Sequence, residues 1–277
     1  MPTSVSSTEN STMPLSVYDF GRELIESKDL DPVYVILHEA QLDVRELCVW
    51  LLPYFCFYHV GTASWISDQK YGDTQYWRRM QQAAGSSDYP RSSERRHFRG
   101  EAALKSVAWL KKRGVLSLFQ PLLGRRDIKA VEVIEYVKTW YLFGDWIAFK
   151  VADILERLGL ASVKFSLDTV LYDSPRKGAE TLWANEMDEE HMPAEVGEWA
   201  VNRILSELGG LQAPPRYERP INAQEAETIL CKWKSYMNGH YHVGEDIEAT
   251  RKGLMRFARC GMSQRLLAAG KKGKLWK

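Results

Sequence analysis

Apolar residues recur at helical spacing along almost the whole chain after residue 16. In 127–141, for example, Val131, Ile134 and Val137 fall on one face of a helix. No run alternates apolar and polar residues for long enough to build a sheet, and 163–165 is the one short segment typical of a strand. The sequence therefore predicts an all-α fold with roughly eight to ten helices.

Prolines, glycines and asparagines indicate where these helices begin and end. Pro32 suits a first-turn position, and Gly114, Gly159 and Gly239 follow the last residues of helical patterns. The expected helices are 31–50, 74–84, 101–113, 127–141, 145–158, 193–208, 222–237 and 244–260.

Three segments are predicted to be loops, because turn-forming or basic residues interrupt the helical pattern. Residues 85–99 are rich in Ser and Arg, and 173–178 read DSPRKG with a basic pair. Residues 209–220 contain three prolines and are expected to form a strap across the surface.

Composition narrows the class of protein. The chain has 277 residues, 45% of them hydrophobic and 26% charged, which is the range of globular proteins. The net charge is only +1, so binding of nucleic acid has to come from local basic patches. The longest apolar stretch, 48–60, contains Pro53 and His59 and is too short to span a bilayer.

The cysteines and the N-terminal segment indicate the compartment. The four cysteines form no CxxC pair, which is typical of a reducing cytosol and disfavours a thiolate metal site. Residues 1–16 are polar and rich in Ser and Thr, so we expect a disordered tail rather than a signal peptide. We further expect one domain over 17–270 and a basic C-terminal tail over 271–277.

Lys150 and Asp168 are separated by a spacing that resembles the helix-hairpin-helix DNA glycosylases of the endonuclease III type. Phe149-Lys150-Val151-Ala152-Asp153 stands where the family has its lysine and following helix, and Leu167-Asp168-Thr169 stands where it has its aspartate. Trp146 and Ala148 replace the hairpin glycines, and the cluster cysteines are missing. On spacing alone, an ordinary amphipathic helix remains an alternative.

The C-terminal segment 229–247, ILCKWKSYMNGHYHVGEDI, is similar to a phage family of DNA-hypermodifying enzymes. These are the amino acid:DNA transferases, or α-glutamyl/putrescinyl thymine pyrophosphorylases. The resemblance implies a helix-hairpin-helix glycosylase-like catalytic domain and a substitution on double-stranded DNA. An amino acid or a polyamine would attack the activated methylene carbon of 5-hydroxymethyluracil, and pyrophosphate would leave. It also implies an upstream DNA base kinase and action in the host cytoplasm, with no membrane and no resident cofactor.

This chemistry requires aromatic surfaces for an extruded base and cations for phosphate. Five aromatic residues are candidates for the base, although core packing is the alternative for each: Trp140, Tyr141, Phe143, Trp146 and Trp183. Six arginines are expected to contact the DNA backbone: Arg91, Arg95, Arg96, Arg99, Arg125 and Arg126. The residues expected to bind substrate are Trp146, His240, Tyr241, Lys232, Lys234, Arg176 and Lys177.

The attacking amine must lose a proton, because an ammonium group is not a nucleophile. Asp168 is the first candidate to accept this proton, followed by His242, His240 and Asp246. Asp246 has an alternative role as a charge in the first turn of a helix, and the two histidines as turn residues.

Lys150 has two readings. In a glycosylase it would be a nucleophile, whereas in a transferase it would neutralise phosphate or hold the acceptor carboxylate.

The acidic stretch 185–191 invites a divalent metal as escort of the pyrophosphate. It is more typical of a solvated turn before a helix, so we predict no metal site.

Two other functions are compatible with these residues. One is a DNA glycosylase or lyase in which Lys150 and Asp168 perform the chemistry at the sugar. The other is a non-enzymatic helical DNA-binding protein whose arginine loops contact phosphate, with a steep dependence of binding on salt.

Overall fold

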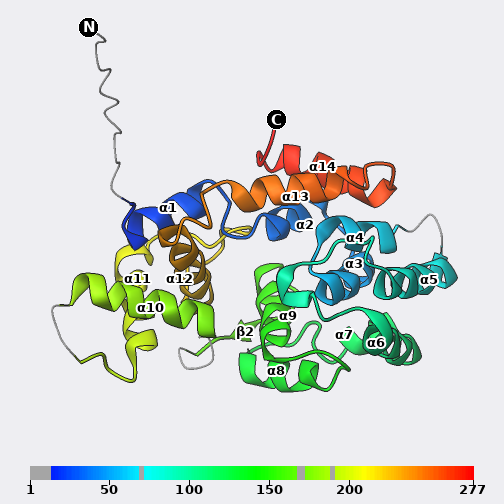
Figure 1. Ribbon diagram of the computed structural model, residues 1–277, viewed down its shortest axis with the longest axis horizontal. Helices are drawn as coiled ribbons and strands as arrows, with labels where there is room; N and C mark the ends of the chain where they lie inside the picture. The colour runs from blue at the N-terminus through cyan, green and yellow to red at the C-terminus, as the bar shows by residue number, and fades with distance from the viewer. Residues whose placement is uncertain (1–13, 69–71, 167–171, 188–190) are drawn as a thin grey trace, which may run out of the picture.

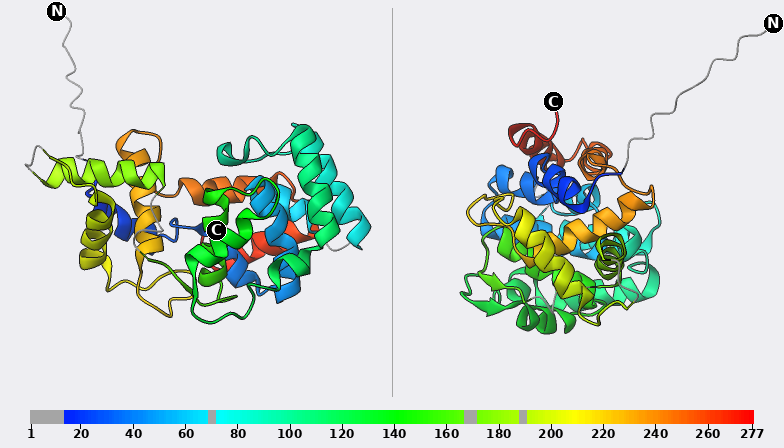
Figure 2. Two further views of the ribbon diagram at one scale, coloured as in Figure 1. Left: turned by 90° about the horizontal axis from the view of Figure 1, so that it is seen from below. Right: turned by 90° about the vertical axis from the view of Figure 1, so that its left-hand side faces the viewer.

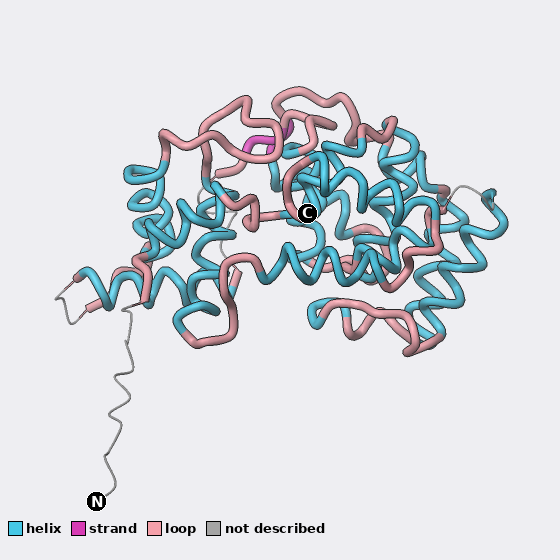
Figure 3. Tube along the Cα trace, turned by 90° about the horizontal axis from the view of Figure 1, so that it is seen from above, coloured by secondary structure: helices cyan, strands magenta, loops and turns pink. Residues whose placement is uncertain are grey.

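The structure is a computed structural model that describes residues 14–68, 72–166, 172–187 and 191–277. Within these residues it contains 14 α-helices, one 3-10 helix and two short strands, so the predicted all-α class is confirmed. Figures 1 and 3 show one small pair of strands among the helices and loops. None of the described helices is long and apolar enough to cross a membrane.

The first half of the chain, up to the first strand, forms the following elements. They are α1 (Val17–Glu26), α2 (Pro32–Ala40), α3 (Val44–Phe57), α4 (Val60–Ile66), α5 (Gly72–Gly85), η2 (Ser93–Arg95), α6 (Gly100–Arg113), α7 (Val115–Phe119) and β1 (Ile128–Lys129). The second half contains α8 (Ala130–Lys138), α9 (Asp145–Arg157), β2 (Val163–Lys164), α10 (Asp173–Glu186), α11 (Val196–Leu208), α12 (Ala223–Met237), α13 (Glu245–Met255) and α14 (Gly261–Lys272).

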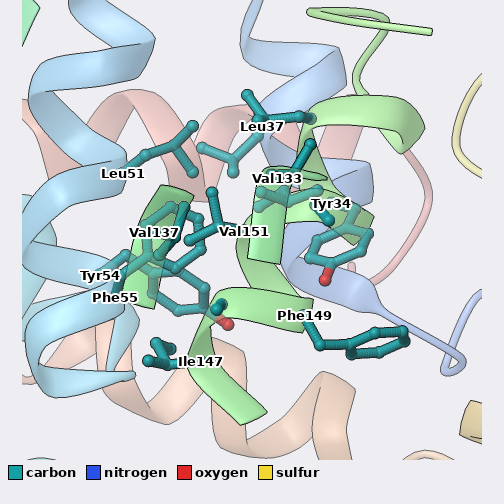
Figure 4. Packing of buried hydrophobic residues seen from close by; sticks show 14 of the residues in the cluster. Tyr34, Leu37, Leu51, Tyr54, Phe55, Val133, Val137, Ile147, Phe149 and Val151 are labelled. Carbon is teal, nitrogen blue, oxygen red and sulfur yellow. The ribbon is translucent and has the colours of Figure 1, made fainter. Parts of the chain in front are cut away.

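Two groups of helices flank α9. Helices α1, α10, α11 and α12 pack against one another at one end of the molecule, and α2 to α8 with α13 and α14 form the rest (Figures 1 and 2). The middle is filled by apolar side chains of α2, α3, α8 and α9. Figure 4 shows Tyr34, Tyr54, Ile147, Phe149 and Val151 among the side chains of this cluster. Helix α9 therefore lies between the two groups of helices, where a functional site could draw residues from both.

The expected strand at 163–165 is confirmed, because β2 pairs in parallel with β1 and Ile128 lies opposite Val163. The expected single helix over 31–50 is wrong. Gln41 adopts a left-handed conformation that ends α2, and the Asp43 side chain then caps α3 by accepting from the Glu46 backbone N–H.

The expected loop at 173–178 is also wrong, because these residues form the first turns of α10. Pro175 lies in the first turn, where a missing N–H group costs no helical hydrogen bond. The expected helix over 244–260 ends at Met255, and α14 then runs from Gly261 to Lys272, into the basic C-terminal segment.

Two glycines bring α4 and α13 unusually close. A Cβ atom on Gly61 would overlap with the carbonyl oxygen of Gly253, so only a glycine fits at this crossing. This contact fixes the C-terminal half of α13 against α4, and the candidate site described below lies where α13 also meets α2.

Candidate active site

Lys150 projects from α9 into a buried group of carboxylates. Its ammonium lies 3.8 Å from a carboxylate oxygen of Asp153, one turn along α9, and 3.8 Å from one of Glu227 on α12. All three side chains are buried. The attraction between the ammonium group and the two carboxylates offsets the desolvation cost of burying these charges.

The pKa values in this group follow from burial and from the neighbouring charges. Burial lowers the pKa of Lys150, but the carboxylates of Glu227 and Asp153 outweigh burial and hold it above its usual value. Lys150 is therefore an ammonium group at neutral pH. Burial raises the pKa of Asp153 to about 7, and burial likewise raises the pKa of Glu227.

A cavity of about 380 Å³ lies beside this group, at the junction of α2, α3, α9 and α13. Its wall combines carboxylates with aromatic rings. The side chains that give it this character are Asp31, Glu94, Asp246, Tyr34, Tyr54, Tyr58 and Trp146. Trp146 meets Tyr58 edge to face with ring centroids 4.9 Å apart, and Tyr54 lies against Tyr58 at 4.7 Å. Such a wall suits a ligand with a cationic end.

A chain of buried ion pairs fixes α9 against its neighbours. The Arg157 guanidinium lies 3.3 Å from Asp31 and 3.1 Å from Glu225, and its Nε donates to the carbonyl of Pro214 at 2.6 Å. Arg219 of the 209–220 strap bridges Glu225 and Glu156. The strap thus packs on α9 and α12. Arg157 of α9 holds Asp31 in place at the cavity wall.

The beginning of α13 is built around Asp29. This buried carboxylate accepts hydrogen bonds from the backbone N–H groups of Gly244 and Ile247 and from the Tyr241 hydroxyl. Lys232 of α12 pairs with Asp246 at 2.6 Å and contacts the Tyr241 hydroxyl. The 229–247 segment therefore places Asp246 at the cavity wall, and it brings together three of the predicted site residues, Lys232, Tyr241 and Asp246.

The histidines of that segment lie elsewhere. His240 and His242 line a separate surface hollow that also includes Glu245 and Glu248, and His242 pairs with Glu245 at 3.2 Å. Neither histidine lines the cavity beside Lys150. Lys234 lies two residues from Lys232 and so faces away from it on α12.

Asp168, the first candidate for accepting a proton, lies outside the described residues, and so do 188–190 of the acidic stretch. In the part of the chain that is described, no group of three or more His, Cys, Asp or Glu side chains could hold a metal ion. Glu186 of that stretch ends α10 and accepts a hydrogen bond from Tyr18 at 2.6 Å.

The predicted arginines divide into buried and exposed ones. Arg95 is only 2% exposed and donates to the carbonyls of Cys56 and Leu142, each at 3.1 Å. This burial contradicts the expected contact with DNA and gives Arg95 a structural role, because it ties η2 to α3 and to the loop before α9. Arg91 is half-buried and donates to the carbonyl of Ala83 in α5 and to that of Ser86 in its own loop. The remaining predicted cations are exposed: Arg96, Arg99, Arg125, Arg126, Arg176 and Lys177.

The aromatic candidates divide in the same way. Trp140, Phe143 and Trp183 are buried in the core, so they are packing residues in this structure. Tyr141 is 43% exposed, and Trp146 alone of the five lines the cavity.

Sequence reasoning missed the residues that surround Lys150, namely Asp31, Tyr34, Tyr54, Tyr58, Asp153, Arg157 and Glu227. One signal was present, because Asp153 interrupts the apolar face of a helix that is otherwise buried. The partners of Lys150 on α2, α3 and α12 carry no such signal, since only the fold brings them to α9.

Comparison of the sequence with known proteins places this chain in a family. The model of the amino acid:DNA transferase family matches residues 25–241. A glycinyltransferase of Pseudomonas phage PaMx11 is 33% identical over 270 residues, covering 88% of this chain and 92% of the relative. A putrescinyltransferase of Delftia phage PhiW-14 is 25% identical over 248 residues, covering 86% of this chain and 78% of the relative. The region matched by the family model contains the whole of α9 and α12, and of the three cavity carboxylates it leaves out only Asp246. The chain belongs to the amino acid:DNA transferase family, and it is a DNA-modifying enzyme that transfers an amine.

Proposed function

We propose that this enzyme transfers an amino acid or a polyamine onto the activated 5-methyl group of 5-hydroxymethyluracil in double-stranded DNA. An upstream DNA base kinase first converts the methyl hydroxyl to its diphosphate ester. The amine nitrogen then bonds to the methylene carbon while the carbon–oxygen bond breaks and pyrophosphate leaves. The observation that carries the proposal is the family match over residues 25–241, within which Lys150 and its carboxylates adjoin an aromatic cavity.

The cavity supports the binding of a cationic amine. Asp31 and Asp246 offer carboxylates, and Tyr58 and Trp146 offer aromatic faces. The modified base has to leave the DNA stack before its methylene carbon can reach such a cavity. The glycosylase-like arrangement expected from the sequence is suited to extruding a base, and we retain it as part of the proposal.

Cations near the cavity support the departure of pyrophosphate. Arg176 and Lys177 are exposed in the first two turns of α10, at a helix N-terminus that favours anions. Tyr172, which precedes these turns, donates its hydroxyl to the carbonyl of Asp145 at the start of α9. The beginning of α10 therefore lies beside the beginning of α9. Lys150 is already paired with two carboxylates, so we assign it to organising the site.

The proposed reaction involves no redox step, and we infer no resident cofactor for it. The relatives with matching sequences are phage proteins, so we place the reaction in the host cytoplasm on phage DNA.

Nucleoside mass spectrometry tests the proposal. Duplex DNA containing 5-hydroxymethyluracil is phosphorylated by a base kinase, incubated with the enzyme and a mixture of amino acids and polyamines, and digested. We expect a new nucleoside with the mass of thymidine plus an amine substituent, which also identifies the amine. Release of the free base would instead indicate a glycosylase. Unchanged activated nucleosides with every amino acid and polyamine would refute the proposal.

A further inference from the structure

Tyr34 connects the cavity to a buried carboxylate. It lies in the first turn of α2 and lines the cavity, and its hydroxyl donates a hydrogen bond to Asp153 Oδ2 at 2.7 Å. The Asp153 side chain is 1% exposed, so no solvent proton reaches it without a relay. Tyr34 is therefore the residue that contacts both Asp153 and the space where an amine would bind.

The second oxygen of this carboxylate is unused. Asp153 Oδ1 is buried and has no hydrogen-bond partner among the residues that the structure describes. A buried carboxylate oxygen without a donor is costly, and binding a proton relieves that cost. Asp153 is therefore poised to exist in either protonation state.

Titratable groups from α9, α12 and the segments that contain Asp31, Tyr34 and Tyr58 surround Asp153. Burial raises its pKa to about 7, and Asp31, which precedes α2, adds to this effect. Lys150 and Arg157 of α9 oppose it, as does the hydrogen bond from Tyr34. Two further groups lie close by, namely Tyr58 at the end of α3 and Glu227 of α12, which shares Lys150 with Asp153. The net result is a carboxyl group that titrates near neutral pH.

We propose that Asp153, acting through the Tyr34 hydroxyl, accepts the proton that the amine must lose before it attacks. This inference rests on the proposed transferase function. Tyr34 passes its phenolic proton to Asp153 and takes one from the ammonium group, which becomes a neutral amine. The amine nitrogen then bonds to the methylene carbon, and the electron pair of the broken carbon–oxygen bond leaves with pyrophosphate. The product nitrogen is a secondary ammonium group, so one proton moves to Asp153 in each turnover.

Other carboxylates at the cavity are less suited to this role. Asp246 is paired with Lys232 at 2.6 Å, and Asp31 with Arg157 at 3.3 Å. A carboxylate held this closely by a cation is a weaker base than Asp153, which lies 3.8 Å from the Lys150 ammonium. Tyr34 itself stays protonated, because burial raises its pKa well above its usual value, so it transmits a proton rather than storing one.

The pH dependence of a single turnover tests the relay. For the wild type, the rate of adduct formation should fall about tenfold per pH unit below about pH 7, because Asp153 becomes protonated. Tyr34→Phe and Asp153→Asn should each be about 100-fold slower at pH 8 and should lose this inflection. Tyr54→Phe is the matched control: it removes another buried phenol from the cavity wall and should keep the inflection.

Each outcome has one meaning. If Tyr34→Phe and Asp153→Asn fold normally and keep the wild-type inflection, the relay is wrong. If Asp168→Ala alone removes the inflection, Asp168 is the proton acceptor and the relay is again wrong. A wild type that forms no adduct at any pH overturns the transferase proposal itself, which separates that failure from a failure of the relay.

Discussion

Asp29 and Ile247 are joined by a hydrogen bond of 2.8 Å from the backbone N–H of Ile247 to a carboxylate oxygen of Asp29. The same carboxylate accepts from the N–H of Gly244 at 2.7 Å, so it caps the N-terminus of α13 from the loop before α2. This arrangement explains why Tyr241, Gly244 and Ile247 occur together in one short segment. They close around a single buried charge, and Asp246 reaches the cavity wall as a consequence.

Replacing Asp29 should therefore loosen the beginning of α13. Asp29→Ala removes a charged acceptor from two backbone N–H groups and a phenol, and we expect a loss of about 3 kcal/mol in the free energy of unfolding. Urea denaturation measures this loss. Asp88→Ala, at an exposed aspartate, is the matched control and should change the free energy by less than about 0.5 kcal/mol. Equal stability of the two variants would show that the carboxylate does not hold α13.

The sequence could predict the helices and the segment around Asp246, because both depend on local patterns. Periodicity predicts α9 and α12 to within a residue or two, and the alternation of apolar and polar residues predicts the short strand at 163–165. It could not predict that Glu227 meets Lys150, since that contact depends on how α12 docks on α9. It also could not separate Arg95 from Arg96, because burial of one guanidinium follows from carbonyls that are 39 and 47 residues away.

Lys150 should not form a covalent intermediate with DNA. Two carboxylates keep it as an ammonium group, despite its burial, and an ammonium group cannot attack a sugar carbon. We expect no borohydride-trapped complex at pH 7 with duplex DNA that carries either 5-hydroxymethyluracil or an abasic site. A helix-hairpin-helix lyase serves as the positive control for trapping. A trapped complex that disappears in Lys150→Met would establish the glycosylase or lyase function instead.

Arg96 and Arg99 should contribute to DNA binding, whereas their neighbour Arg95 should contribute to stability. Both exposed arginines belong to the same loop as Ser92 and Glu94, which line the cavity. Arg96→Ala and Arg99→Ala should each weaken binding uniformly across sequences and reduce the slope of log K against log salt by about 0.9. Fluorescence anisotropy at several salt concentrations measures that slope.

Two comparisons give this experiment its controls. Lys272→Ala, on α14 and paired with Glu39, should leave the salt slope unchanged. Arg95→Ala should lower the free energy of unfolding by about 3 kcal/mol, because it leaves two buried carbonyls without their donor. A wild-type salt slope in both Arg96→Ala and Arg99→Ala would exclude this loop from the DNA interface.

His59 should make the protein sensitive to mild acid. It caps α4, because its Nδ1 accepts a hydrogen bond from the Thr62 N–H at 3.1 Å, and only a neutral imidazole can do so. Burial, with Arg256 in support, lowers its pKa to about 4. The unfolded chain binds a proton near pH 6.5 and the folded chain does not. The contribution of His59 to the free energy of unfolding is therefore present above pH 6.5 and is lost as the pH falls toward 4.

His59→Asn keeps a capping acceptor that does not titrate. Its free energy of unfolding should fall by about 2 kcal/mol less than that of the wild type between pH 7 and pH 4. Urea denaturation at both pH values measures the difference, with the exposed His191→Asn as control. An equal loss in the wild type and in His59→Asn would mean that folding does not lower the pKa of His59.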